Sequence, residues 1–218
     1  MHNMDNRTEK EKIIVKSPAT TANMGPGFDC IGMALNLFNF ISFEIGCHPS
    51  IEIIGNGANE LSRGPDNMVI RGFAVVFETL GVEVPKVSMI CHNDIPLRRG
   101  LGSSAAAVAG GMVAANVLTG EKISLNELLR LADRIEGHPD NVAPALFGGC
   151  QIVLRSGGRL ISRPIPVDSQ LSAILLIPDL EIPTEKARKV MPSYLPIQDA
   201  IHNVGRAALL SMALTNGD

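Results

Sequence analysis

The stretch "PLRRGLGSSAAAVAGG", residues 96–111, joins a glycine-containing loop to a run of small residues. The small residues predict a helix over 104–118. The first turn of a helix leaves backbone N–H groups unpaired and carries a partial positive charge, so it stabilises an anion that the preceding chain approaches closely. Gly100 and Gly102 permit that approach, and the two serines that follow add hydroxyls for a phosphate and a metal ion. The stretch therefore predicts a polyphosphate site.

Three other interpretations of this loop compete with a phosphate site. "GLGSSA" matches a dinucleotide-binding fingerprint, but "NDIPLRR" (93–99) separates it from the preceding strand, and Glu121 follows a helix where that fold needs a carboxylate after a strand. A P-loop requires a lysine before the serines, and none is present. The third alternative is a tight turn that feeds a small-residue packing helix, and the stretch taken alone leaves it open.

A second polar segment, "SPATTANMGPGFDCIG" (17–32), lies between two predicted strands. It places Asn23, Gly25, Gly27 and Asp29 in one turn, which is longer than a plain connection needs. Because loops of this kind have the freedom to surround a ligand, the segment is a candidate binding loop.

A third polar segment, "RIEGHPDNVAPALFGG" (134–149), ends a predicted helix at Glu136. Taken alone, Glu136 is most simply a solvated helix-end carboxylate, but Asp140 and Asn141 just after it favour a polar site. His138 has no second His or Cys at ligand spacing, so a structural or loop-ordering role is favoured over zinc binding.

Composition limits the partners of the chain. Its 218 residues are 45% hydrophobic, and 19 basic against 22 acidic residues give a net charge of −3. No basic cluster exceeds the Arg98–Arg99 pair, so nucleic acid is not an expected partner. The longest uncharged apolar stretch, 100–120, is interrupted by Gly, Ser and Asn, and no membrane segment is expected. Four widely spaced cysteines and no apolar leader predict a cytoplasmic protein with small-molecule partners.

Hydrophobic patterns predict an α+β layered fold after a disordered tail at residues 1–12. Asp66 or Asn67 would cap the first helix and Gly81 would end it, while Ser124 and Glu127 form a capping box. The predicted strands are 13–17, 35–45, 50–54, 86–92, 150–154 and 172–178. The predicted helices are 66–81, 104–118, 124–136, 184–191 and 197–214.

Three segments together, "SPATTANMGPGFDCIG", "PLRRGLGSSAAA" and "EGHPDNVAPALFGG", resemble the homoserine kinase family of the GHMP kinase superfamily in order and spacing, as does "TEKARKVMP" (184–192). The resemblance runs from about residue 13 to the end of the chain. It implies the two-layer GHMP kinase fold. A ribosomal-protein-S5-like nucleotide-binding domain would span 13–155, and an incomplete ferredoxin-like domain would span 156–218.

The resemblance implies a kinase that uses ATP and Mg²⁺ to phosphorylate the side-chain hydroxyl of L-homoserine, giving O-phospho-L-homoserine in threonine biosynthesis. Two alternatives stay open: a non-catalytic nucleotide-binding relative, and a GHMP kinase for another small alcohol. The second is disfavoured because Arg188 and Asp29 suit an amino-acid zwitterion. The resemblance leaves a homodimer open.

Residue roles follow from the resemblance position by position. Ser104 and Glu136 would hold Mg²⁺. The substrate would contact Asn23, Asp29, Asn141 and Arg188. Asp140 lies where mevalonate kinase-like relatives place a proposed general base, although phosphoryl transfer through a loose transition state leaves the need for a base open. The nucleotide would contact Asn67, Pro96, Leu97, Arg98, Arg99, Gly100, Leu101, Gly102, Ser103, Ser104, Ala105 and Ala106.

The sequence departs from the family pattern in two places. Many relatives have a third glycine in the loop where this chain has Arg98 and Arg99, so added positive charge would compensate for lost flexibility. Relatives also continue past "ALTNGD" with another substrate-binding arginine and a glycine-rich motif, so the chain is expected to be about a third short of the family length. On that basis it is expected to aggregate, to bind Mg-ATP weakly and to turn over homoserine at least about a thousandfold slower than a full-length enzyme.

Overall fold

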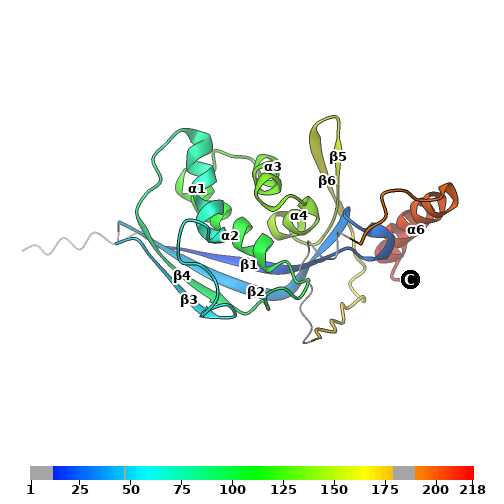
Figure 1. Ribbon diagram of the computed structural model, residues 1–218, viewed down its shortest axis with the longest axis horizontal. Coiled ribbons are helices and arrows are strands. Elements are labelled where there is room, and N and C mark those ends of the chain that lie inside the picture. Colours follow the sequence, from blue (N-terminus) through cyan, green and yellow to red (C-terminus); the bar gives the residue numbers. More distant parts are fainter. Residues whose placement is uncertain (1–11, 47, 179–189) are drawn as a thin grey trace, which may run out of the picture.

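The computed structural model describes residues 12–46, 48–178 and 190–218, which form a layer of helices over one sheet (Figure 1). Helices α1 to α4 cover one face of the sheet, and α6 lies at the end near the β5–β6 hairpin. The strands are β1 (Lys12–Ala22), β2 (Ile31–Ile45), β3 (Ser50–Gly55), β4 (Val87–Asn93), β5 (Cys150–Ser156) and β6 (Arg159–Ile165). The helices are the 3-10 turn η1 (Gly25–Gly27), α1 (Met68–Leu80), α2 (Ser103–Leu118), α3 (Leu125–Glu136), α4 (Pro139–Phe147) and α6 (Ile197–Asn216).

The sheet is mixed, with strand order β3-β4-β2-β5-β6 and with β1 paired to β2. Strands β3 and β4 are parallel, and the other pairs are antiparallel. The long strand β2 pairs with β5 through Ile31–Met33 and with β4 through Asn39–Ile45. This topology differs from the parallel, doubly wound sheet that a dinucleotide fingerprint requires, so that alternative for the "GLGSSA" loop is excluded.

Small residues let α1 and α2 pack backbone against backbone. A Cβ on Gly72 would lie 2.3 Å from the Val108 carbonyl oxygen, and one on Gly111 would lie 2.2 Å from the Val69 carbonyl oxygen. The body of α2 is therefore a packing helix, as the third interpretation of the 96–111 stretch predicted. This packing places the N-terminus of α2 at the edge of the core, where the glycine loop meets it.

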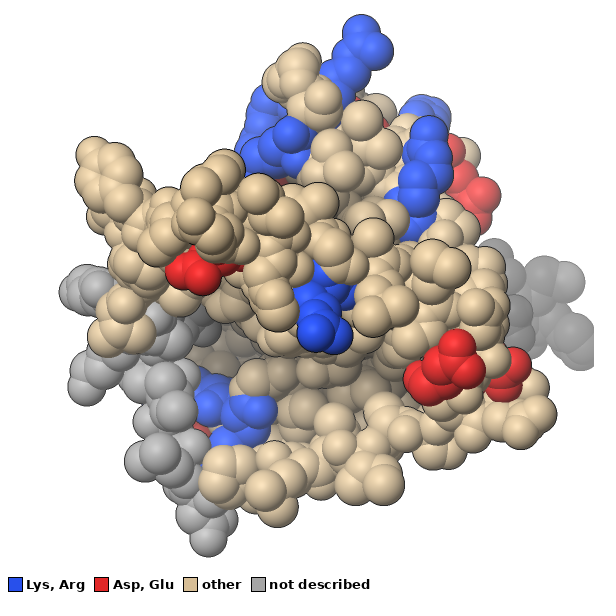
Figure 2. Space-filling model, turned by 90° about the vertical axis from the view of Figure 1, so that its right-hand side faces the viewer, with Lys and Arg blue, Asp and Glu red and all other residues tan. Residues whose placement is uncertain are grey.

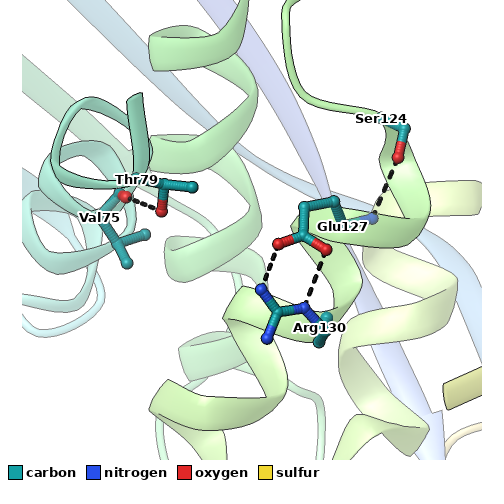
Figure 3. A network of polar contacts seen from close by, with 5 residues as sticks. All are labelled: Val75, Thr79, Ser124, Glu127 and Arg130. Atoms are coloured by element: carbon teal, nitrogen blue, oxygen red, sulfur yellow. Dashed lines mark hydrogen bonds and ion pairs between the residues drawn. The ribbon is translucent and has the colours of Figure 1, made fainter. Parts of the chain in front are cut away.

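Two of the predicted helix starts are confirmed at atomic detail. The Asn67 side-chain oxygen accepts a hydrogen bond from the Val69 N–H at 2.9 Å. The Ser124 hydroxyl accepts one from the Glu127 N–H at 3.3 Å, as Figure 3 shows. The Glu127 carboxylate accepts from Arg130 Nε at 2.8 Å, so its bonds run along the helix face rather than back to the cap. Of the two hydrogen bonds of a capping box, the one to the Ser124 hydroxyl is therefore formed, while the Glu127 carboxylate bonds to Arg130 instead.

Several expectations about the second half of the chain are corrected. Residues 172–178 form no strand, because no described element lies beside them to complete a hydrogen-bond ladder, and Ile174 is 95% exposed. The sequence interpretation missed β6 and α4. The predicted helix at 197–214 is confirmed as α6. Most of the predicted helix at 184–191 lies outside the described residues. The expected tail at 1–12 also lies outside them, apart from Lys12, which begins β1. The division at 155/156, just before the last residue of β5, stays a prediction.

The end of the molecule formed by α6 is largely uncharged. Figure 2 shows this side with basic and acidic side chains in small separate groups on a mostly neutral surface. On α6 itself, Ile201 and Val204 are exposed, while Leu210 and Leu214 pack against the cluster around Ile31. In the described part of the chain, no helix combines the length and apolar character that crossing a membrane requires.

Candidate functional site

The glycine loop ends where α2 begins and is packed closely onto β1. Thr20 N–H donates to the Leu101 carbonyl at 3.0 Å. Gly102 has a φ of +62°, and a Cβ there would lie 1.9 Å from Thr20 Oγ1, so only glycine fits this position. Gly102 is also the N-cap of α2 and offers no side-chain acceptor. The first-turn N–H groups of α2 are therefore available to an external anion.

A serine and a carboxylate meet beside this helix start. Ser104 Oγ donates to Glu136 Oε1 at 2.6 Å, which joins the first turn of α2 to the last residue of α3. Among the described residues, no group of three or more His, Cys, Asp or Glu side chains forms a metal cluster. One hydroxyl and one carboxylate suit Mg²⁺, which accepts one or two protein oxygens and takes its other ligands from phosphates and water.

Helix α4 brings a second carboxylate to the same region. Asp140 is 1% exposed, and its Oδ1 accepts from the Asn141 backbone N–H at 2.9 Å. Thr20 Oγ1 donates to Asn141 Oδ1 at 2.8 Å, so α4 is tied to β1. Strand β2 passes so close that a Cβ on Gly32 would lie 1.9 Å from the Asp140 carbonyl oxygen. Asp140 and Asn141 are thus held by contacts with two strands.

Two cavities open around these elements. The first, which we call the loop cavity, has a volume of about 400 Å³ and is lined by Ala22, Asn23, Arg98, Gly100, Leu101, Gly102, Ser103, Ser104, Ala105, Glu136, His138, Asp140 and Asn141. The second, which we call the α1 cavity, has a volume of about 440 Å³ and is lined by Asn39, Ile41, Ile53, Glu60, Leu61, Ser62, Asp66, Asn67, Met68, Val69, Cys91, Asn93, Leu97, Arg98, Ser103, Ser104 and Ala107. The two share Arg98, Ser103 and Ser104, so they meet at the start of α2.

The turn between β1 and β2 contributes the other predicted polar residues. Asn23 and Asp29 both have positive φ, of 60° and 59°, and Asn23 Oδ1 accepts from the Asp29 N–H at 3.0 Å. Burial raises the pKa of the neighbouring Cys30 thiol above its ordinary value, and the charges of Asp140 and then Asp29 raise it further. The turn and α4 therefore act electrostatically on the same thiol.

The structure brings most of the predicted site residues together. Asn67 lines the α1 cavity while it caps α1, and Asn23, Ser104, Glu136, Asp140 and Asn141 line the loop cavity. Neither cavity is lined by Pro96, Arg99, Ala106 or Asp29. Arg188 lies outside the described residues.

Sequence reasoning missed several lining residues and one contact beneath them. Asn39 and Asn93 line the α1 cavity from neighbouring strands. Asn39 lay within a predicted strand, and Asn93 lay just past the end of another, in the segment 93–99 that leads to the glycines. Thr20 bonds to Asn141 of α4, which is 121 positions away in the sequence, and no local signal marks such a contact.

Comparisons with known proteins agree with this arrangement. The family description "GHMP kinases N terminal domain" matches residues 67–149. Homoserine kinase from Desulfitobacterium hafniense is 42% identical over 200 residues, which cover 92% of this chain and 67% of that protein. Homoserine kinase from Thermosynechococcus vestitus is 44% identical over 205 residues, which cover 94% and 68%.

Solved structures give the same result. Homoserine kinase from Cytophaga hutchinsonii superposes with a TM-score of 0.82 at 30% identity, covering 99% of this chain and 71% of that one. Methanococcus jannaschii mevalonate kinase, with a TM-score of 0.54 at 16% identity, shares the fold alone. The expected GHMP kinase fold is therefore confirmed. With identity above 40% over nearly its whole length, the chain belongs to the homoserine kinase family.

Proposed function

We propose that the chain transfers the γ-phosphoryl group of ATP to the side-chain hydroxyl of L-homoserine, the activity that the names of its relatives state. The observation that carries this proposal is the meeting of two cavities at Arg98, Ser103 and Ser104. A nucleotide base in the α1 cavity would place its phosphates at the start of α2. The terminal phosphate would then face Asp140 and Asn141 in the loop cavity.

The α1 cavity has the lining that a nucleotide base requires. Ile41, Ile53 and Val69 supply apolar walls, while Asn39 and Asn93 supply amide groups. The α2 amides and the loop glycines would then hold the phosphates, and the Arg98 guanidinium, which borders both cavities, would add positive charge. This supports ATP as the phosphoryl donor.

Ser104 and Glu136 would hold Mg²⁺, because their oxygens already lie together at the start of α2. A bound Mg²⁺ would neutralise charge on the transferring phosphoryl group. The reaction forms a bond between the homoserine side-chain oxygen and the γ-phosphorus. It breaks the bond to the oxygen that bridges to the β-phosphate, so that ADP leaves. The hydroxyl proton passes to Asp140 or to water.

The acceptor would lie against the β1–β2 turn and α4. The Asp29 carboxylate suits the ammonium group of an amino acid, Asn23 and Asn141 suit its polar groups, and an arginine at position 188 suits its carboxylate. Asn23 and Asn141 line the same cavity as Asp140, which supports a short substrate with its hydroxyl at Asp140. A cytoplasmic location, the homodimer and the exclusion of nucleic-acid and membrane partners stay predictions.

The proposal is tested with the purified chain, ATP, Mg²⁺ and either L-homoserine or mevalonate. The products are followed by ³¹P NMR, with ADP release as a second signal. We expect a phosphomonoester of homoserine and none of mevalonate. Equal turnover of both alcohols would refute the substrate assignment. Tight Mg-ATP binding without any phosphorylated homoserine would instead favour a non-catalytic nucleotide-binding role.

A further inference from the structure

We infer that Thr20 is a positioning residue for the proposed phosphoryl transfer: its hydroxyl fixes the side-chain amide of Asn141 so that this amide donates into the loop cavity. The inference rests on the proposed function and assigns a role to Thr20, which lies in the 17–32 segment but was not among the predicted site residues. Thr20 would act through Asn141, since it is not among the residues that line the cavity.

Thr20 contacts both walls of the site from beneath. Its side chain is fully buried in β1. Its N–H donates to the Leu101 carbonyl of the glycine loop at 3.0 Å, and its Oγ1 donates to Asn141 Oδ1 at 2.8 Å. Gly102 covers it so closely that no Cβ fits between them. A single residue therefore links the loop that would hold phosphate to the helix that carries Asp140.

The surrounding groups decide which way the Asn141 amide points. Asp140 Oδ1 accepts from the Asn141 backbone N–H at 2.9 Å, and Asn141 Nδ2 lies 3.4 Å from the same oxygen. A carboxylate oxygen only accepts hydrogen bonds, so the amide nitrogen must face Asp140 and the amide oxygen must face Thr20. The reversed amide would set two oxygens against each other. Thr20 satisfies the amide oxygen because a hydroxyl can donate.

This orientation has a consequence for any hydroxyl bound in the loop cavity. With its oxygen engaged by Thr20, Asn141 offers the cavity an N–H donor. A substrate hydroxyl would accept that hydrogen bond and direct its own proton toward a carboxylate, and Asp140 lines the same cavity. The attacking oxygen would then keep a lone pair free for the phosphorus. Thr20 thus orients the attacking substrate hydroxyl indirectly, through the side-chain amide of Asn141.

The first experiment compares Thr20→Val with Thr20→Ser and with the matched control Thr21→Val. Valine has the shape of threonine but no hydroxyl, and the backbone bond to Leu101 is retained. We expect Thr20→Val to lower kcat about 10- to 100-fold, with the KM for Mg-ATP changed less than about twofold. Thr20→Ser keeps the hydroxyl and should restore most of kcat. Thr21→Val removes a hydroxyl from the next residue of β1 and should behave as the parent. Equal kcat in Thr20→Val and the parent, or equal losses in the valine and serine variants, would overturn the inference.

The second experiment asks whether Thr20 acts through Asn141. In an Asn141→Ala background, Thr20→Val should change kcat less than about twofold, because the amide that Thr20 orients is gone. An undiminished effect in that background would overturn the inference. A parent chain without turnover would refute the proposed function instead. The same cycle of variants is then measured by urea unfolding, where strictly additive losses of stability would show that the Thr20–Asn141 contact does not exist.

Discussion

Ser104 Oγ donates to Glu136 Oε1 at 2.6 Å, and this bond connects the N-terminus of α2 to the C-terminus of α3. The two residues are 32 positions apart, and the intervening chain forms a helical hairpin that returns to the glycine loop. Two oxygens that suit Mg²⁺ therefore border the place where phosphates would bind.

Removal of either oxygen should weaken metal-dependent nucleotide binding. We expect Ser104→Ala and Glu136→Gln to raise the Kd for ADP about 10- to 100-fold in the presence of Mg²⁺, since a charge-assisted contact is lost. Binding of ADP with EDTA should change far less. Isothermal titration calorimetry measures both, and Ser50→Ala, which removes a sheet hydroxyl paired with Ser88, is the control. An equal loss with and without Mg²⁺ would contradict the metal role.

The two loop glycines should differ in their tolerance of alanine. Gly100 has a φ of +70° and nothing within 4 Å of a Cβ, so Gly100→Ala should cost about 1 kcal/mol of unfolding free energy. Gly102→Ala adds a clash with Thr20 Oγ1 to a similar backbone cost and should cost at least about 2 kcal/mol. Urea unfolding compares the two, and equal costs would show that the loop does not pack on β1 as described.

Arg98 should add positive charge to the proposed nucleotide site, and its backbone conformation should at the same time lower the stability of the chain. Its φ of +54° is a conformation that glycine adopts freely, and its guanidinium pairs with Glu60 at the border of both cavities. Arg98→Gly and Arg98→Ala should both lower ATP affinity about five- to tenfold, because both remove the positive charge. The glycine variant should be the more stable of the two, by up to about 1 kcal/mol. If Arg98→Ala bound ATP as tightly as the parent, the Arg98 guanidinium would have no part in nucleotide binding.

Cys30 should report the charge on Asp140. The negative charge disfavours the thiolate and so raises the pKa of Cys30, in addition to the larger effect of burial. Asp140→Asn should lower that pKa, increase the thiolate fraction at pH 8 and speed alkylation by iodoacetamide, with the whole pH–rate curve moved to lower pH. Asp29→Asn should have the smaller effect of the two.

The alkylation is measured by mass spectrometry in a Cys47→Ser background. Cys91 and Cys150 are buried, and burial raises the pKa of each to about 11, so they should react slowly. An unchanged rate in Asp140→Asn would show that the carboxylate does not act on the thiol.

Local signals predicted the elements that begin and end by local chemistry. The Asn67 and Ser124 caps and the stop at Gly81 depend on neighbours within a few residues, and all three lie where expected. The serine pair at the start of α2 was predicted for the same reason. Five of the six predicted strands were also placed correctly, although β1 and β2 each extend further into the turn that carries Asn23.

The features that the sequence did not predict depend on distant partners. Helix α4 begins at Pro139 and contains Pro144, whose missing N–H argues against a helix; the Asp140 carbonyl, which would have received that bond, lies against Gly32 instead. Residues 172–178 have a strand composition, but pairing requires a neighbour that composition cannot supply. The link between Thr20 and Asn141 exists only once β1 and α4 are packed together.

The junction of the two cavities at Arg98, Ser103 and Ser104 favours direct transfer between donor and acceptor in the proposed reaction. Donor and acceptor would occupy separate compartments and meet at one point, so the phosphoryl group has no need to reside on the protein. A single in-line displacement inverts the configuration at phosphorus. A γ-phosphate made chiral with oxygen isotopes would therefore emerge on homoserine with the opposite handedness.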